Sequence, residues 1–412
     1  MANVSSSNGL EKRPKHRFPG FDEPWEHKEL LYYLVENTDR NKQLKFGKEN
    51  VLSVSGEYGI VNQIAFQGRS FAGESVADYH VVETDDIVYT KSPLKANPYG
   101  IIKVNNGVPG IVSTLYAVYH PLKTVVPRFV DFYFSNDLRL NKFLKPLVNI
   151  GAKHDMKVNN TFVLTGMVVF PPLREQQKIV DFLTILDRRI DVQRKKVEAL
   201  KKYKRGLLSR EFGQQENGDL NNRYVGKLKD YFHLSSGSTP SSTNRAFYSG
   251  NIRWVSSGEL KPKYLCETSQ HISSEAVSSC NLREYPANTL LVAMYGLEAA
   301  GVRGTASILS VPATISQACM AIQQTGEIDI EYLYYWYIYN GQWIGIRIAQ
   351  GTKQQNLSTD TLGNLRIHAP SCSKQKKVCK LLSQIDYLIE KEGQKIDLLS
   401  SAKSGLLQQL FI

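Results

Sequence analysis

One long segment occurs twice in this chain of 412 residues. Residues 171–212 reappear as residues 370–411, at a constant offset of 199 positions and without a gap. In both copies aliphatic residues recur at intervals of four and three, the spacing of a coiled-coil seam. The seam positions are Ile179, Leu183, Leu186, Ile190, Gln193, Val197, Leu200, Lys204 and Leu207 in the first copy, and Val378, Leu382, Ile385, Ile389, Glu392, Ile396, Leu399, Lys403 and Leu406 in the second. Independent amphipathic helices would seldom share polar interruptions at the same places, so the repeat indicates an internal duplication.

The duplication predicts an α+β fold in which two domains alternate with two long helices. Each half has about 200 residues, enough for one domain core and one helix. We place the domains at residues 18–170 and 224–369, and the helices at 171–212 and 370–412. Residues 1–17 lack an apolar core and predict a disordered tail. Residues 213–223 contain turn formers and almost nothing apolar, which predicts a flexible linker.

Weaker matches connect the two domain bodies at an offset of 203 positions. Residues 87–90 match residues 290–293, and both runs are strand-like. Residues 129–134 match residues 332–337, and both runs are rich in aromatic residues with i, i+3, i+4 spacing. A helix packed on a sheet is the interpretation that we favour for this run. Stacking of unpaired bases on its rings is the alternative.

The charge of the chain favours an anionic partner. There are 51 Lys and Arg against 39 Asp and Glu, a net charge of +12. Half of this excess lies in residues 171–212, which hold 12 Lys and Arg against 6 Asp and Glu. The basic face of this helix could contact phosphates, or it could simply be solvated.

The cysteines form no pattern that binds metal or builds a disulfide framework. Five are present, with no C-x-x-C pair, at Cys266, Cys280, Cys319, Cys372 and Cys379. This usage fits a reducing cytoplasm best.

No apolar run reaches the ~18 residues that a membrane span needs, so we expect a soluble globular protein.

No catalytic signature accompanies the repeat. The chain contains no Pro-Asp dipeptide, so a Pro-Asp…Glu-x-Lys nuclease site is excluded, and no Walker or G-x-G-x-x-G loop follows a predicted strand. The Asn-Pro-Tyr run at residues 97–99 lacks the second proline of a methyltransferase tetrad. Histidines are scattered without metal-ligand spacing. We therefore expect no catalytic, cofactor or metal site in this chain.

Four runs are distinctive beyond their composition: FPPLREQQKIV at residues 170–180, GSTPS at 237–241, YSGNIRWVSSGEL at 248–260 and GTKQQNLS at 351–358. Weaker signals are NVLSVS at residues 50–55 and GIV at 59–61. Together with the helical repeat, these runs resemble the specificity subunits of type I restriction-modification enzymes. The junction before the second helix, APSCSKQ at residues 369–375, departs from the family pattern because it loses one proline and the glutamate.

The resemblance implies a DNA-reading subunit without an active site. Its two domains would be target recognition domains, each binding half of a bipartite, asymmetric target in double-stranded DNA. The two helices would pair as an antiparallel coiled coil and hold the half-sites apart. The implied partners are methylation subunits, two in number, and restriction/translocase subunits. S-adenosylmethionine, ATP and Mg are expected on those partners and not on this chain.

Base edges are read by Arg or Lys on guanine and by Asn or Gln on adenine, while other cations bind phosphates. Our candidates lie in polar, turn-rich stretches, where a solvated loop cation is the alternative. They are Arg69, Lys91, Lys95, Asn97, Tyr99, Lys153 and His154 in the first domain, and Arg253, Ser256, Lys261, Lys263, Tyr295, Arg303, Lys353, Gln354 and Gln355 in the second.

The helices have two further expected roles. Phe182 and Leu381 widen the apolar stripe beyond a narrow seam, which would suit a third helix from a partner subunit. Gln193 and Glu392 lie near the helix midpoints and could hydrogen-bond across the seam, which would determine its register.

Two other functions remain open at this stage. The chain could be a stand-alone sequence-specific DNA-binding regulator without a methylation partner. It could also be a coiled-coil adaptor that joins protein partners, with a basic face that only keeps it soluble. Sequence-selective DNA binding at moderate salt separates the adaptor from both DNA-reading alternatives, because adaptor charge alone gives salt-labile, sequence-blind association.

Overall fold

The computed structural model describes residues 14–150, 156–213, 224–349, 351 and 355–411. The predicted tail and linker lie almost entirely outside these residues. The chain divides into two compact units: unit 1 is Met1–Arg194 with Gln394–Ile412, and unit 2 is Lys195–Gly393. This division falls within both long helices, α5 (Leu173–Phe212) and α10 (Cys372–Gln409). Each unit therefore contains one sheet domain and a segment of each helix.

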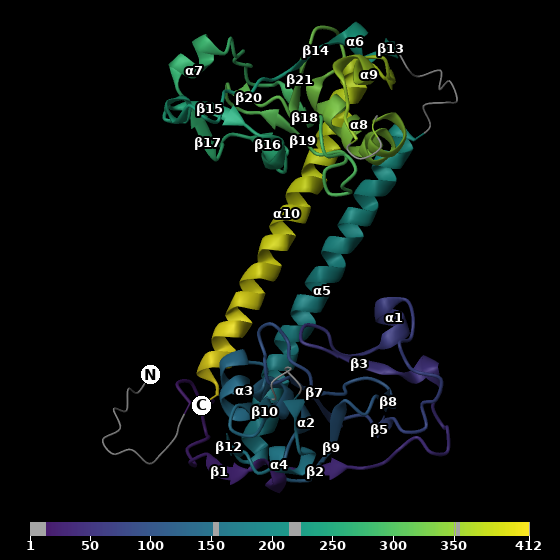
Figure 1. Ribbon diagram of the computed structural model, residues 1–412, viewed down its shortest axis with the longest axis vertical. Coiled ribbons are helices and arrows are strands. Elements are labelled where there is room, and N and C mark those ends of the chain that lie inside the picture. The colour runs from purple at the N-terminus through teal and green to yellow at the C-terminus, as the bar shows by residue number, and fades with distance from the viewer. Residues whose placement is uncertain (1–13, 151–155, 214–223, 350, 352–354, 412) are drawn as a thin grey trace. The chain divides into compact units, whose positions relative to one another are not determined.

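Unit 1 is built on a four-stranded antiparallel sheet with the order β2-β9-β6-β7 (Figure 1). Its strands are β1 (Glu26–Glu29), β2 (Leu34–Asn37), β3 (Leu52–Ser55), β4 (Gly59–Asn62), β5 (His80–Val82), β6 (Ile87–Thr90), β7 (Ile102–Val104), β8 (Gly110–Val112), β9 (Tyr116–Pro121), β10 (Asn149–Ile150), β11 (Met156–Lys157) and β12 (Met167–Phe170). Its short helices are α1 (Gln63–Gln67), α2 (Pro127–Tyr133), α3 (Asp137–Leu144) and α4 (Asn160–Val163).

Unit 2 repeats this sheet with one additional strand, in the order β14-β21-β18-β19-β16. Its strands are β13 (Tyr224–Lys227), β14 (Phe232–Ser236), β15 (Ile252–Val255), β16 (Tyr264–Leu265), β17 (Gln270–Ile272), β18 (Leu290–Ala293), β19 (Ala306–Leu309), β20 (Thr314–Ile315), β21 (Cys319–Gln324) and β22 (Arg366–Ala369). Its helices are α6 (Leu228–Tyr231), α7 (Ser274–Ser279), α8 (Ile330–Trp343) and α9 (Thr359–Gly363). The mixed helices and sheets and the repeated order confirm the predicted fold class.

The aromatic runs form helices that pack on these sheets, so the packing interpretation is confirmed. In α2, Phe129 and Phe132 are buried, and in α8 Tyr332 and Tyr335 are buried, each within the hydrophobic core of its own unit. A ring enclosed by core residues cannot stack on a nucleic-acid base. The role of these aromatic residues is to fill the space between helix and sheet.

The end of each long helix belongs to the core of a unit. In unit 1, the Phe411 ring at the end of α10 lies 5.3 Å from Phe129 and 6.5 Å from Trp25. In unit 2, the Phe212 ring at the end of α5 lies 5.1 Å from Tyr332. Phe411 and Phe212 occupy equivalent positions of the repeat and are both buried. Neither core is complete without the far end of a helix that starts after the other sheet domain.

A buried glutamine secures the start of each long helix. In unit 1, Gln176 donates to the Pro171 carbonyl and accepts from the Val126 N–H at the start of α2, both at 2.9 Å. In unit 2, Gln375 donates to the Pro370 carbonyl at 2.9 Å and accepts from the Asp329 N–H at 2.8 Å. Both side chains are at most 1% exposed. One amide therefore satisfies a buried donor and a buried acceptor that the helix geometry leaves without partners.

The two long helices run antiparallel. Within unit 2, Lys196 of α5 bonds Glu392 of α10 at 2.9 Å, and Lys204 bonds Asp386, so numbers rise along one helix as they fall along the other. Within unit 1, Lys403 of α10 bonds Asp187 of α5, the equivalent pair of the repeat. The seam residues are buried or half-buried in their own units.

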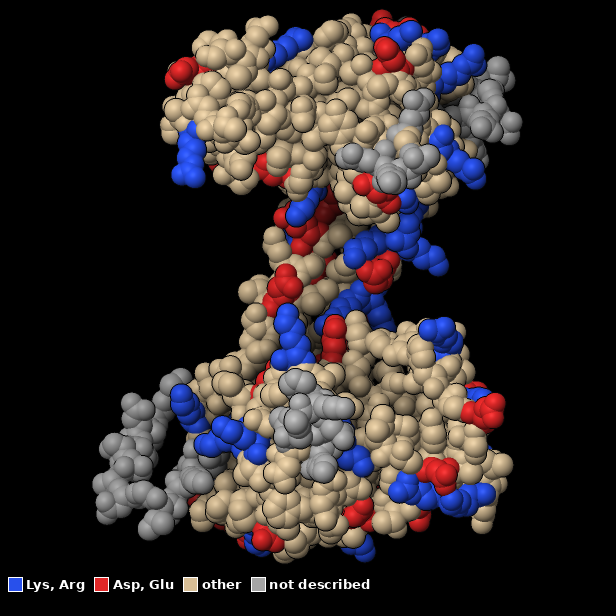
Figure 2. All heavy atoms as spheres, in the orientation of Figure 1, with Lys and Arg blue, Asp and Glu red and all other residues tan. Residues whose placement is uncertain are grey.

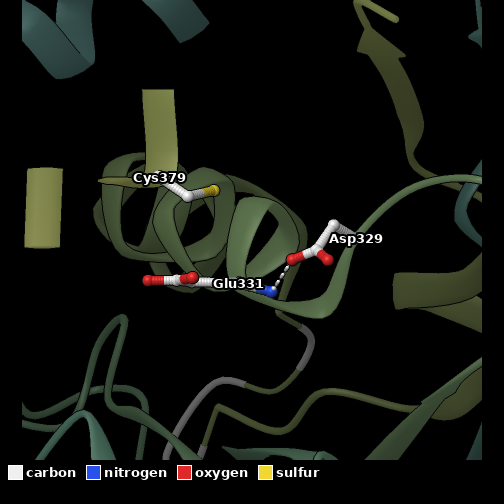
Figure 3. A group of neighbouring side chains, drawn as sticks. All are labelled: Asp329, Glu331 and Cys379. Carbon is white, nitrogen blue, oxygen red and sulfur yellow. Dashed lines mark hydrogen bonds between the residues drawn. The ribbon is translucent and has the colours of Figure 1, made fainter. Parts of the chain in front are cut away.

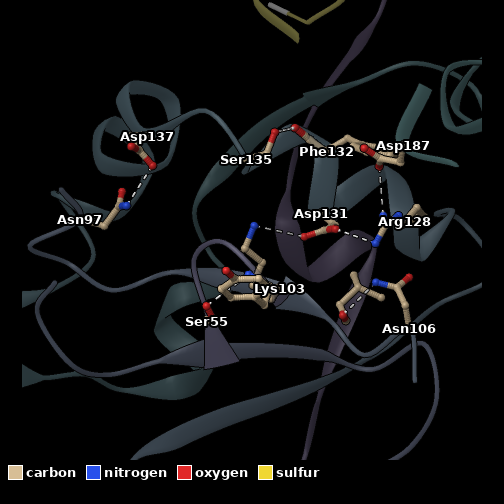
Figure 4. A network of polar contacts seen from close by, with 12 residues as sticks. Ser55, Asn97, Lys103, Asn106, Arg128, Asp131, Phe132, Ser135, Asp137 and Asp187 are labelled. Carbon is tan, nitrogen blue, oxygen red and sulfur yellow. Dashed lines mark hydrogen bonds and ion pairs between the residues drawn. The ribbon is translucent and has the colours of Figure 1, made fainter. Parts of the chain in front are cut away.

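The Asp187 pair extends into the sheet domain of unit 1 (Figure 4). Arg128 lies 3.3 Å from Asp187 and 3.0 Å from Asp131, and Lys103 lies 3.6 Å from the other oxygen of Asp131. This chain of charges joins α5 to α2 and to strand β7. The partly buried positions of these groups strengthen the pairing relative to a fully solvated surface pair.

Two predictions concern the contact between Gln193 and Glu392 and the disorder of the tail. Glu392 is 4% exposed and accepts from Lys196, while the expected contact between Gln193 and Glu392 would join the two units and stays a prediction. Arg17, which the sequence placed in the tail, donates to the buried Glu175 at 2.8 Å. The tail prediction was wrong at this residue, because a carboxylate that is 1% exposed requires a counter-charge.

The glutamine contacts can be tested by replacing Gln176 with Leu. We expect this variant to unfold at a lower urea concentration, with a loss of about 1–3 kcal/mol, because the Val126 N–H and the Pro171 carbonyl become buried without partners. The matched control is Gln177→Leu, since Gln177 is exposed and, among the described residues, its side chain bonds only Asp181 on its own helix. Equal unfolding midpoints for the two variants would contradict the proposed role of Gln176.

Candidate nucleic-acid interface

The loop after β6 carries four of the candidates in unit 1. Lys91 is half-buried, and Lys95 is exposed. Asn97 is 7% exposed and donates to Asp137 at 2.9 Å (Figure 4), so its amide organises the loop. Tyr99 is partly buried, and its carbonyl accepts from the Tyr89 hydroxyl at 2.7 Å. The structure thus brings these residues together, but only the two lysines present cations at the surface of the loop.

Lys91 lies in a polar recess between β2, this loop and α4. Its ammonium donates to the Asn160 side chain at 3.3 Å, and Asn160 in turn donates to Glu36 at 2.8 Å. The recess encloses about 730 Å³. Burial lowers the pKa of Lys91, the nearby Arg40 lowers it further, and Glu36 opposes both effects. Glu36 and Asn160 were missed by the sequence analysis, because β2 and α4 meet only in the folded unit.

One further candidate of unit 1, Arg69, lies outside this loop. Arg69 follows α1, and its guanidinium lies 4.6 Å from the centre of the Phe71 ring. Lys153 and His154 fall outside the described residues, as do Lys353 and Gln354 of the second domain.

A second group forms around the loop after β18 in unit 2. Arg303 donates to the Leu297 carbonyl at 2.7 Å and to the Glu298 carbonyl at 2.8 Å, so it holds the loop closed. The Gln355 N–H donates to the Glu298 carboxylate at 3.0 Å. Tyr295 lies in the same loop and is 36% exposed. The structure therefore brings Tyr295, Arg303 and Gln355 together.

Three further candidates lie near β15. Arg253 is half-buried and donates to the Cys266 carbonyl at 3.1 Å. Ser256 donates through its N–H and its hydroxyl to Glu259, at 2.8 and 2.9 Å, which caps the short turn that follows. Lys261 is exposed. Two of these three residues are cations. Among the described residues, the Arg253 guanidinium has a hydrogen-bond partner and the Lys261 ammonium has none.

Lys263 is placed differently from our expectation. Its ammonium donates to Glu331, to the Tyr335 hydroxyl at 2.9 Å and to Ser383 of α10 at 2.6 Å. All three N–H groups are thereby used, and the side chain is 13% exposed. Although burial opposes it, the bonds from Lys263 and Ser383 lower the pKa of Glu331. Lys263 joins α8 to α10, and its ammonium has no N–H group left for a DNA contact.

Three neighbouring side chains in unit 2 have a composition that could hold a metal ion: Asp329, Glu331 and Cys379 (Figure 3). Asp329 caps α8 by accepting from the Glu331 N–H at 2.8 Å. Glu331 pairs with Lys263. Burial raises the pKa of the Cys379 thiol, which keeps it protonated and a poor ligand. Each group has a structural role, and a bound cation would compete with Lys263.

The helices present both charge and apolar surface. Lys and Arg gather along the face of α5 that Figure 2 shows. Exposed cations on this helix include Arg188, Arg189, Arg194, Lys195, Lys196, Lys201, Lys202 and Arg205. In unit 1, a groove of about 690 Å³ is lined by Ile185, Arg188, Arg189, Val192, Gln193, Lys395, Leu398 and Leu399. Ile185, Val192 and Leu398 are more than half exposed in it.

The two residues expected to widen the apolar stripe differ in exposure. The Phe182 ring packs edge-on against Phe18 of the same unit, with 5.4 Å between centroids. Leu381 is 40% exposed in unit 2. Phe182 is thus already covered, while the exposed apolar groups of unit 1 lie farther along the helix.

Comparison with known proteins adds two relatives in sequence and one solved structure of similar fold. The chain is 29% identical over 192 residues to the type I restriction enzyme MjaIX specificity subunit of Methanocaldococcus jannaschii, covering 46% of this chain and 43% of that protein. It is 25% identical over 176 residues to the EcoR124I/EcoR124II specificity subunit of Escherichia coli, covering 42% of each. These two alignments span less than half the length of each relative. The crystal structure of a type I restriction-modification S subunit from M. genitalium has the same fold, with a TM-score of 0.59, 14% identity, and coverage of 97% of this chain and 99% of that one.

Among the described residues, no helix is both long enough and apolar enough to cross a membrane.

The family model for the type I restriction modification DNA specificity domain matches residues 76–202 and 222–400, one match in each half of the repeat. Since these matches cover most of the chain, the protein belongs to the type I restriction-modification DNA specificity family.

Proposed function

We propose that this chain is the DNA-reading, non-catalytic subunit of a type I restriction-modification complex. Each unit would bind one half of a bipartite target, and the paired helices would set the distance between the halves. The observation that carries this proposal is the repeated scaffold: both units have the same sheet order and the same helix contacts, but different residues in their loops.

The loop residues support an asymmetric target. The loop after β6 carries Lys91 and Lys95, whereas the equivalent loop after β18 carries Met294 and Tyr295 and is closed by Arg303. Side chains of different hydrogen-bonding capacity select different base edges. The two half-sites would therefore differ in sequence.

The long helices support a role in spacing. Helix α5 has 40 residues, and at about 1.5 Å per residue it extends about 60 Å, more than the roughly 34 Å of one DNA turn. Its exposed cations would add sequence-independent attraction to phosphates.

Catalysis would belong to partner subunits in the cytoplasm. Two methylation subunits would supply S-adenosylmethionine, and restriction/translocase subunits would supply ATP and Mg chemistry. The apolar groove of unit 1 suits a methylation subunit, because Ile185, Val192 and Leu398 are exposed apolar groups flanked by cations.

Methylation-aware genome sequencing tests the function directly. We expect host DNA to carry a methylated bipartite motif when this chain and its methylation subunit are present. The motif should disappear when this chain alone is deleted. A methylome that does not change would favour the stand-alone regulator, and purified chain that binds DNA only in a salt-labile, sequence-blind way would favour the adaptor.

Partner docking can be tested in the groove with the double variant Ile185→Asp and Leu398→Asp. Burying two aliphatic side chains contributes about 1.5–3 kcal/mol each, so we expect at least a ~10-fold loss of affinity for the methylation subunit in a pull-down titration. The control is Leu138→Asp on α3, where Leu138 is 82% exposed and outside the groove. Unchanged affinity in the double variant would exclude this groove as the docking site.

A further inference from the structure

Three polar residues of unit 1 stand where unit 2 has apolar or smaller ones. Glu36 of β2 lies opposite Tyr119 of β9, and its repeat equivalent is Leu234 of β14, which lies opposite Ile322 of β21. Asn160 is the first residue of α4, and its equivalent is Thr359, the first residue of α9. The internal repeat thus provides a comparison for each position.

The third residue is Lys91, whose equivalent is Met294. Each directly follows the matching strand, β6 or β18. The Lys91 N–H donates to the Leu115 carbonyl at 3.2 Å, and the Met294 N–H donates to the Ala318 carbonyl at 2.9 Å. Since both backbones make the same contact, the difference between the units lies in the side chains. Met294 is 6% exposed and belongs to the core of unit 2.

These residues of unit 1 form one connected group. Asn160 donates to one Glu36 oxygen at 2.8 Å, and the Thr161 hydroxyl donates to the other at 3.1 Å. Lys91 donates to the Asn160 side chain, and the Tyr119 hydroxyl donates to the Asn160 backbone carbonyl at 2.9 Å. Asn160 therefore holds the carboxylate and the ammonium in a defined geometry on one side of the recess.

The scaffold itself does not require this group. Unit 2 builds the same sheet with Leu234 and Met294 at the equivalent positions, and taking a charged side chain partly out of water costs free energy that an apolar side chain does not. A partly buried charged group at positions that the repeat fills with apolar residues in unit 2 is typical of a binding site.

The charges select the kind of ligand. Within the described part of the chain, the Lys91 ammonium donates one side-chain hydrogen bond, which leaves two N–H groups for a ligand. The Glu36 oxygens keep lone pairs beyond the two bonds that they accept. A phosphate at Lys91 would be repelled by the Glu36 carboxylate. A neutral group with acceptors beside a donor fits better, and the major-groove edge of a G·C pair has this arrangement: guanine O6 and N7 accept, and cytosine N4 donates.

We infer that Lys91 and Glu36 read one G·C pair in the half-site bound by unit 1, with Lys91 donating to guanine O6 and N7 and Glu36 accepting from the cytosine amino group. Asn160 is the positioning residue for both. This inference rests on the proposed function, because it names the base pair that unit 1 recognises.

The test uses the full chain assembled with its methylation subunits. Binding is measured to duplexes in which every base pair of the target is replaced in turn, for the wild type and for Lys91→Met, the residue that unit 2 carries. We expect Lys91→Met to lower discrimination at one G·C pair by about 10- to 100-fold, the range of a bidentate base contact, and to leave the other positions unchanged. The thermal midpoint should be equal to that of the wild type or higher.

Two more variants make the test specific. Lys123→Met removes the same charge from an exposed position just after β9, outside the candidate set, and should change discrimination at no position. Glu36→Leu, which again copies unit 2, should affect the same base pair as Lys91→Met. A uniform loss of affinity in Lys91→Met would indicate a phosphate contact and overturn the inference. So would unchanged discrimination, or an effect of Glu36→Leu at a different base pair. Failure of the proposed function would look different, because the wild-type complex would then not discriminate between sequences at all.

Discussion

Burial of each long helix's last aromatic residue in a domain core is the contact on which the rest of this structure depends. Phe411 contacts Phe129 and Trp25 in unit 1, and Phe212 contacts Tyr332 in unit 2. Burying one phenylalanine contributes about 1.5–3 kcal/mol, and the neighbouring residues of the helix add to it. Because its core needs the end of α10, unit 1 combines two separate stretches of chain, residues 1–194 and 394–412. The helices are therefore structural parts of both units as well as connections between them.

The repeat shows which contacts the architecture needs. Gln176 and Gln375 make the same pair of buried hydrogen bonds, and the two Lys–Asp pairs between the helices are equivalent. Each of these lysines also lies over an aromatic ring of the adjacent helix, 5.3 Å from Phe132 or 5.5 Å from Tyr335. Contacts that occur twice define the scaffold. Contacts that occur once, such as the Lys91 recess, are free to differ between the units and can serve recognition.

This separation has a consequence for how specificity could change in such a protein. Among the described residues, the Lys91 and Arg303 side chains bond groups of their own sheet domains. Replacing them should therefore leave the ion pairs between the long helices intact. Lys263 shows the opposite case, because it lies just before β16 but bonds residues of α8 and α10. Replacing Lys263 would disturb the bonds that hold α8 against α10, and its effect would not be confined to a single base contact.

The sequence by itself determined the duplication, the seam and the packing of the aromatic helices on the sheets. These features depend on spacing along the chain, and helical periodicity is a local property that side-chain chemistry reveals directly. The internal bonds that the cations make were decided only by the tertiary structure. Lys91 and Lys263 look alike in sequence, each in a polar stretch. Among the described residues, the Lys91 ammonium donates one side-chain hydrogen bond, whereas the Lys263 ammonium donates three. The partners that make this difference are Asn160 for Lys91 and Glu331 and Ser383 for Lys263, all more than 60 positions away, and no local pattern encodes such contacts.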